Sequence, residues 1–184
     1  MSLAGHRHAQ WALAAIAFVE SSVFPVPPDV LLVPMVLADR RRAFRLAAIC
    51  TAASVVGGMM GYAIGALAFE TVGRAIIDFT GAGEDFTAFR QMYGQWGFLI
   101  VFTAGLTPLP YKVFTIASGV AALNPVVFIL GSLASRGIRF FGEAWLLRRF
   151  GQPVHTFVEK NLWVFSAWFV VAITGGFVAA RLMF

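Results

Sequence analysis

Long apolar runs alternate with short polar segments along this chain of 184 residues. The first run, about residues 9–38, is interrupted by prolines, whereas the second, residues 43–69, is smooth. The smooth run is long enough to cross a bilayer as one helix. Residues 70–94 are polar and amphipathic, which predicts a surface segment with a turn at Gly81–Gly83.

The second half of the chain repeats this order. A proline-interrupted run covers about residues 96–123, and the next helix is expected over 125–149, because proline suits a first helical turn. A further smooth run closes the chain. The pattern therefore predicts a single all-α transmembrane domain over residues 1–184. Its expected parts are repeat 1 (about 9–69), the surface segment (70–94), repeat 2 (about 96–149) and an extra spanning helix (161–184).

Composition agrees with a polytopic membrane protein. Hydrophobic residues make up 59% of the chain, charged residues 12%, and the mean hydropathy is +0.79. Soluble domains carry about a quarter charged residues. The net charge of +5 does not indicate nucleic-acid binding, because the basic residues lie in short loops between apolar runs.

Two short stretches mark the interruptions: FPVPPDV at residues 24–30 and TPLPYKV at residues 107–113. An offset of 83 residues aligns their prolines and places Asp29 opposite Lys112. The aligned prolines are Pro25 with Pro108 and Pro27 with Pro110, and Pro28 is an additional helix breaker in the first stretch.

Each interrupted run is either one kinked spanning helix or a hairpin that enters the bilayer, turns and leaves on the same side. Several prolines together favour the hairpin, because each removes a backbone donor and clashes with the preceding turn. One spanning helix separates the two hairpins, so they would enter from opposite faces. This is an inverted repeat, and broken helices at corresponding positions of two halves are typical of transport sites.

The basic loops predict the orientation of the chain. More arginine and lysine residues fall on the side of the N-terminus, so the positive-inside rule places the N-terminus in the cytoplasm and the C-terminus outside. On the N-terminal side lie Arg7, Arg40, Arg41, Arg42, Arg45, Arg148, Arg149 and Lys160, against Arg74, Arg90 and Arg181 on the other.

Equal numbers of acidic and basic side chains fall at or near membrane depth, which predicts a paired cluster inside the bundle. We expect Asp29 and Lys112 to meet across the two turns, either as a structural ion pair or as part of a transport site. Arg139 and Glu143 share one helix face and can also pair with each other. The full candidate set is Glu20, Asp29, Lys112, Arg136, Arg139 and Glu143.

Two chemical readings of this cluster stay open. Glu20 either satisfies backbone donors freed at its own proline turn or acts as a protonatable carboxyl. The helix start after the second turn, beside Lys112 and Arg136, predicts a phosphate site. The three histidines are scattered and form no metal-ligand set, and the chain has no motif of a soluble enzyme or cofactor site, so we expect neither catalysis nor a cofactor.

Three stretches resemble the DedA family, also called SNARE-associated or VTT-domain proteins, and within it the YqaA branch. They are FVESSVFPVPPDVLLVP, FTAGLTPLPYKVFTIASGVAALNP and SRGIRFFGEAWLLRRFG, which together lie within about residues 15–150. The resemblance implies opposed re-entrant hairpins and translocation of undecaprenyl phosphate or phospholipid in the bacterial inner membrane. It also implies functional roles for Glu20, Asp29, Arg136 and Arg139. Lys112 departs from the family, whose better-studied members carry arginine there.

We therefore expect a flippase- or scramblase-like transporter of an anionic, phosphate-headed lipid, with proton coupling as an open alternative. A secondary transporter for a small soluble anion is the next reading. A structural or assembly factor, whose charges only hold the fold, is a third. The lipid, the direction of transport and the oligomeric state do not follow from the residues.

Overall fold

The computed structural model describes residues 7–22, 27–107 and 110–151, and this part of the chain is helical, without strands. The first half contains α1 (Arg7–Ser22), α2 (Asp29–Ala38) and the long α3 (Ala43–Ala68). A short 3-10 turn, η2 (Arg40–Arg42), joins α2 to α3.

In the second half a π-helical turn, η3 (Phe69–Gly73), extends α3 into α4 (Arg74–Thr80). The chain reverses at Gly81, whose φ of 70° lies in the left-handed region that suits glycine. The helices that follow are α5 (Gly83–Leu106), α6 (Tyr111–Val120) and α7 (Pro125–Phe150).

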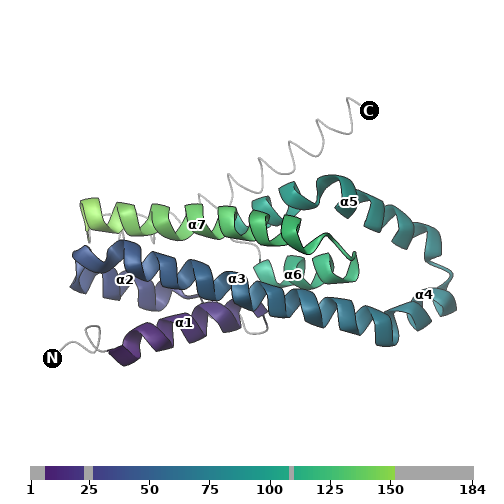
Figure 1. The fold of residues 1–184 in the computed structure, drawn as a ribbon, viewed down its shortest axis with the longest axis horizontal. Helices are drawn as coiled ribbons and strands as arrows, with labels where there is room; N and C mark the ends of the chain where they lie inside the picture. The colour runs from purple at the N-terminus through teal and green to yellow at the C-terminus, as the bar shows by residue number, and fades with distance from the viewer. Residues whose placement is uncertain (1–6, 23–26, 108–109, 152–184) are drawn as a thin grey trace.

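The helices form two hairpins that open toward opposite ends of the molecule. Helix α1 runs inward and α2 returns to the end where α1 begins, while α5 and α6 do the same from the other end (Figure 1). Both chain breaks therefore lie near the middle. The element lengths match as well, since α2 and α6 have 10 residues each and α3 and α7 have 26 each.

Each hairpin packs into its own apolar cluster. One cluster joins α1 and α2 to the first half of α3 and the last half of α7, with Leu13, Leu32 and Phe140 fully buried. The other joins α5 and α6 to the start of α7, with Val101 and Phe128 at its centre. The region between the two clusters is where the breaks and the buried polar side chains lie.

Helix α3 touches a helix of each hairpin through glycines. The Cα of Gly57 faces the carbonyl oxygen of Phe18 on α1, and the Cα of Gly65 faces that of Ile116 on α6. A side chain at either position would overlap the facing backbone. The small residues of α3 therefore set how closely α1 and α6 approach it, a form of packing that is common between helices in membranes.

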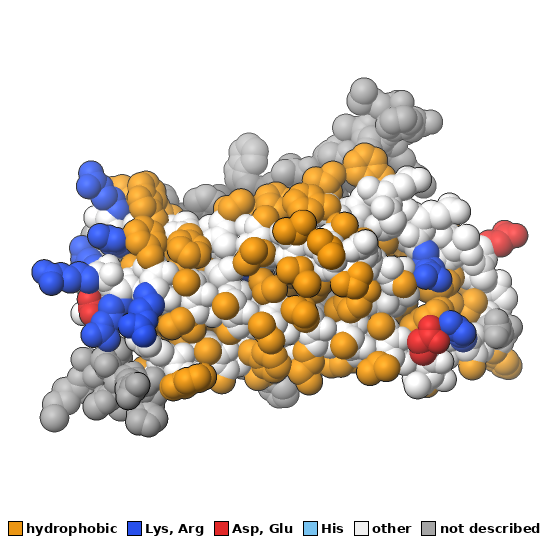
Figure 2. Space-filling model, viewed as in Figure 1, with side chains coloured by type: hydrophobic (Ala, Val, Ile, Leu, Met, Phe, Trp, Pro, Cys, Tyr) orange, Lys and Arg blue, Asp and Glu red, His pale blue; other side chains and the backbone are white. Residues whose placement is uncertain are grey.

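Two stretches of helix are long and apolar enough to cross a membrane, Arg40–Gly73 and Pro125–Phe150. Both correspond to predicted spanning helices. Apolar side chains cover the middle of the visible face, and basic side chains gather at one end (Figure 2). The predicted spanning helix 161–184 lies outside the described residues.

The predicted surface segment, residues 70–94, continues as helix into the start of the second repeat. The turn near Gly81 is present, but α5 then runs without interruption from Gly83 to Leu106. One helix therefore spans the predicted change from the surface segment to the second apolar run near residue 95. No proline falls within this stretch, and Gly94 and Gly97 are tolerated inside a helix at a modest cost.

Candidate functional site

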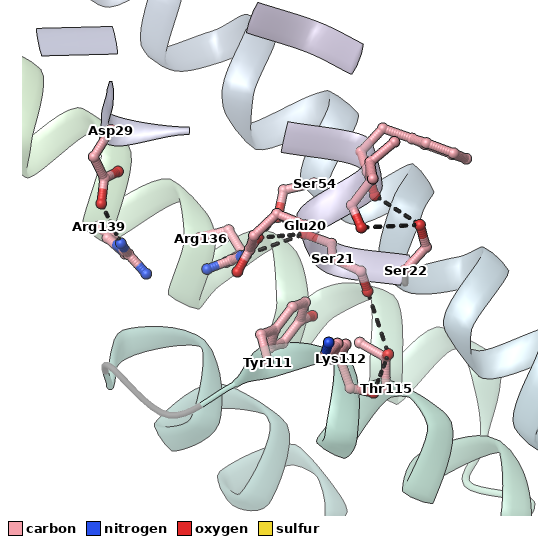
Figure 3. Close-up of polar contacts among 12 residues, drawn as sticks. Glu20, Ser21, Ser22, Asp29, Ser54, Tyr111, Lys112, Thr115, Arg136 and Arg139 are labelled. Carbon is pink, nitrogen blue, oxygen red and sulfur yellow. Dashed lines mark hydrogen bonds and ion pairs between the residues drawn. The ribbon is translucent and has the colours of Figure 1, made fainter. Parts of the chain in front are cut away.

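Arg136 is the centre of a buried polar cluster between the two hairpins. Its side chain is only 1% exposed and forms an ion pair with Glu20, which is 15% exposed. Its Nε donates a hydrogen bond to Ser54 Oγ at 2.6 Å, and its Nη2 donates to Ser21 Oγ at 3.0 Å. One guanidinium on α7 thus connects α1 and α3 (Figure 3).

Helix α6 contributes an aromatic ring to the same arginine. The guanidinium carbon of Arg136 lies 4.4 Å from the centre of the Tyr111 ring, a cation–π arrangement. The Tyr111 hydroxyl donates to Ser132 Oγ on α7, and Thr115 Oγ1 lies 3.4 Å from the backbone oxygen of Ser21. Arg136 is therefore surrounded by hydrogen-bonding and aromatic partners from α1, α3 and α6.

A second ion pair joins Asp29 to Arg139, with Oδ2 and Nη2 2.6 Å apart. It is more open than the first, because 27% of the Arg139 side chain and 32% of the Asp29 side chain are exposed. Asp29 is the first residue of α2, where the helix dipole favours a negative charge. Its other oxygen, Oδ1, is buried and has no hydrogen-bond partner among the described residues.

Glu143 joins this second pair. It lies four residues after Arg139 on α7 and interacts electrostatically with both Asp29 and Arg139. The close ion pair of Arg139 is with Asp29, and not with Glu143 as the alternative prediction had it. Two carboxyl groups therefore compete for one guanidinium at this place.

The predicted contact between Asp29 and Lys112 is wrong: Asp29 pairs with Arg139 instead. Lys112 lies at the start of α6 beside Tyr111 and Thr115, on the other side of the Glu20–Arg136 pair (Figure 3). The reason is lateral packing. The two residues do occupy equivalent hairpin positions, but α2 packs against α7, which presents Arg139 to it.

Of the prolines predicted to form the turns, Pro27, Pro28 and Pro110 are described, and they lie between helices. Pro28 immediately precedes α2, and Pro110 immediately precedes α6. The carbonyl oxygen of Pro28 accepts from Leu31 N and Leu32 N, which begins α2. Pro25 and Pro108 lie outside the described residues, so their expected role as turn residues stays a prediction.

Sequence reasoning missed the hydroxyl groups of this site. Ser21, Ser54 and Ser132 are fully buried, and Tyr111 is 1% exposed. A serine in an apolar helix commonly bonds to its own backbone, so its presence alone does not predict a role. Tyr111, directly before Lys112 in the second proline stretch, was the one residue whose position pointed to the site.

The guanidinium groups of this arrangement can bind an anion in place of a carboxylate partner. The described residues do not bring together three or more His, Cys, Asp or Glu side chains that could bind a metal ion. Arg136 has its partners supplied by the protein. Arg139 is partly exposed and pairs with the carboxylate of Asp29. The two arginines therefore differ in what they can offer to a ligand.

Comparison with known proteins places the chain among bacterial relatives. It is 35% identical over 173 residues to an uncharacterized protein of Haemophilus influenzae, covering 94% of this chain and 89% of that one. It is 34% identical over 177 residues to a Histophilus somni protein described as an uncharacterized homologue of HI0703, covering 94% and 90%. No family model and no solved structure matches. Similarity of this extent over nearly the whole of each chain shows that the protein belongs to the same family as these two proteins.

Proposed function

We propose that this chain is a multi-pass protein of the bacterial inner membrane that moves an anionic, phosphate-headed lipid across the bilayer. The observation that supports this most is the pairing of Asp29 with Arg139 and of Glu20 with Arg136 at the level where two opposed hairpins break. Charges are expensive at membrane depth and are kept there mainly for function.

The dimensions of the hairpins fit a re-entrant arrangement. Helices α2 and α6 have 10 residues each, which corresponds to about 15 Å, half of a hydrocarbon core of about 30 Å. With α3 and α7 as spanning helices, both breaks would lie near the midplane. The matching order and lengths of the elements support an inverted repeat of the kind that builds transport sites.

Arg139 is the residue we assign to the lipid head group. A guanidinium binds phosphate through two parallel hydrogen bonds, and Arg139 is partly exposed whereas Arg136 is buried. The neighbouring Ile138 is 58% exposed, which suits acyl chains that stay in the bilayer while the head group crosses. In this proposal Glu20 and Arg136 hold the hairpins in place around the path.

Asp29 acts in this proposal as an internal anion that the phosphate replaces. A displaced carboxylate would be left beside Glu143 without its guanidinium, an unfavourable arrangement of like charges. Taking up a proton would relieve it, so transport would be coupled to protons.

The resemblance to the DedA family is part of the proposal. It implies roles for the same acidic residues and arginines that form ion pairs in the structure. It is also the reason for proposing a lipid substrate instead of a soluble anion. We propose transport as the activity, without catalysis and without a cofactor.

The test is reconstitution of the full chain into liposomes, with labelled undecaprenyl phosphate and labelled phospholipids scored separately for crossing. Wild type should move at least one of them, Arg139→Gln should lose most of that activity, and Arg74→Gln, which removes an exposed arginine far from the breaks, should retain it. Movement of a soluble anion but no lipid would favour the secondary transporter. No movement of either, in protein that is folded, would favour the structural reading.

A further inference from the structure

Basic side chains gather at the end of the molecule where α2 passes into α3 and where α7 finishes (Figure 2). Asp39 is the carboxylate that forms an ion pair there in the described part of the chain, with Arg42 Nε at 2.9 Å. We call this cluster the arginine end. It consists of Arg40, Arg41, Arg42, Arg45, Arg148 and Arg149.

The fold itself uses two of these side chains. Arg42 pairs with Asp39, and the guanidinium of Arg40 lies against the Cα of Gly151, the residue that ends α7. Cations are favourable at the C-terminus of a helix, so Arg40 stabilises the end of α7. The other four arginines are exposed and have no carboxylate within ion-pair distance among the described residues.

These four arginines lie on adjoining helix ends, and an aromatic contact of Arg148 joins the two ends. Arg41 and Arg45 flank the start of α3, and Arg148 and Arg149 lie in the last turn of α7. The guanidinium carbon of Arg148 lies 5.0 Å from the Phe44 ring centre, and Phe44 stacks on Phe141 with centroids 6.2 Å apart. The positive charges are thus kept close together although like charges repel.

We infer that the arginine end binds the phosphate groups of anionic phospholipids in the leaflet it faces. Exposed aromatic side chains, Phe44, Trp145 and Phe150, lie among these arginines. Aromatic rings of this kind concentrate at the level of lipid head groups. Both helices long enough to cross a membrane have an end here, so the guanidinium groups would reach phosphate depth. A site for nucleic acid or for an acidic protein would not require exposed aromatic side chains around the arginines.

This inference rests on the membrane placement in the proposed function, but not on transport. Clustered arginines beside a membrane attract anionic lipids, and each contributes about a fivefold gain in binding at low salt. A guanidinium also makes the paired hydrogen bonds to phosphate that an ammonium cannot. We therefore expect both the charge and the shape of these side chains to matter.

The test uses the purified full chain in detergent, with phosphatidylglycerol or phosphatidylcholine added and retained lipids counted by native mass spectrometry. Wild type should retain phosphatidylglycerol in preference to phosphatidylcholine. Arg149→Gln should weaken that retention about fivefold, and Arg148→Gln with Arg149→Gln should weaken it further. The double change to lysine should recover only part of it. Arg74→Gln, at the opposite end, is the matched control and should retain lipid as wild type does.

Equal retention of both lipids, or unchanged retention in the Arg148→Gln/Arg149→Gln protein, would overturn the inference. Inorganic phosphate provides the other arm: if it displaces phosphatidylglycerol at equal concentration, the site is one for free phosphate. The liposome assay separates the two proposals. Loss of lipid preference with intact lipid crossing removes only this inference, whereas retained preference without crossing removes only the transport function.

Discussion

Arg136 on α7 and Glu20 on α1 form an ion pair across 116 residues of sequence, and the arginine side chain is almost completely buried. Ser21 and Ser54 accept further hydrogen bonds from the same guanidinium. The site therefore contains one closed charge pair and, at Asp29 and Arg139, one open pair.

Removing Glu20 should destabilise the protein strongly. Glu20→Ala leaves the Arg136 guanidinium buried without its counter-charge, which costs roughly 3–5 kcal/mol. Thermal unfolding in detergent, followed by gel filtration, measures this loss. Combining Glu20→Gln with Arg136→Met removes both charges and should restore most of the stability. As a control, Glu70→Ala breaks the exposed Glu70–Arg74 pair and should change the unfolding free energy by less than about 0.5 kcal/mol.

Asp29 should be energetically coupled to Arg139 and not to Lys112. A double-mutant cycle with Asp29→Ala and Arg139→Ala should give an interaction energy of about 1 kcal/mol, since the two side chains are in contact and partly exposed. The parallel cycle with Lys112→Ala should give less than about 0.5 kcal/mol. A larger interaction energy of Asp29 with Lys112 than with Arg139 would contradict the Asp29–Arg139 ion pair.

Two glycines of α3, Gly57 and Gly65, should tolerate no side chain. In Gly57→Ala the new Cβ would overlap the backbone oxygen of Phe18, and in Gly65→Ala that of Ile116, so each should cost roughly 1–3 kcal/mol. Gly94→Ala is the matched control, because it lies inside α5 with nothing nearby and should stabilise by up to about 1 kcal/mol. Unfolding midpoints of the three variants compare them directly, and equal midpoints would exclude close packing of α3.

The two ends of α3 should lie on opposite sides of the membrane. In a Cys50→Ser background, Arg41→Cys and Glu84→Cys each add a cysteine at an exposed position near one end of the molecule. An impermeant thiol reagent applied to intact cells should label the second variant, and should label the first only after the membrane is opened. Labelling of both from the same side would contradict the inverted-repeat arrangement.

The sequence by itself determined the helical composition, the helix starts after Pro28 and Pro110, the two helices long and apolar enough to cross a membrane, and the four charged residues that form the ion pairs of the site. These features are local, because the length of an apolar run, the steric effect of a proline and a charge within an apolar run can each be read from neighbouring residues. The continuity of α5 through residues 94–96 was missed, since polarity changes there without a helix breaker.

Only the tertiary structure decided which charges pair. Asp29 and Lys112 lie at the starts of α2 and α6, yet Asp29 contacts Arg139, because α2 packs on α7. The same holds for Ser21, Ser54 and Tyr111, whose partners lie on other helices. An ion pair depends on the sideways distance between helices, and that distance is set by packing, including the glycines of α3. Sequence spacing records positions along the chain, and so it could identify the members of the site without identifying their partners.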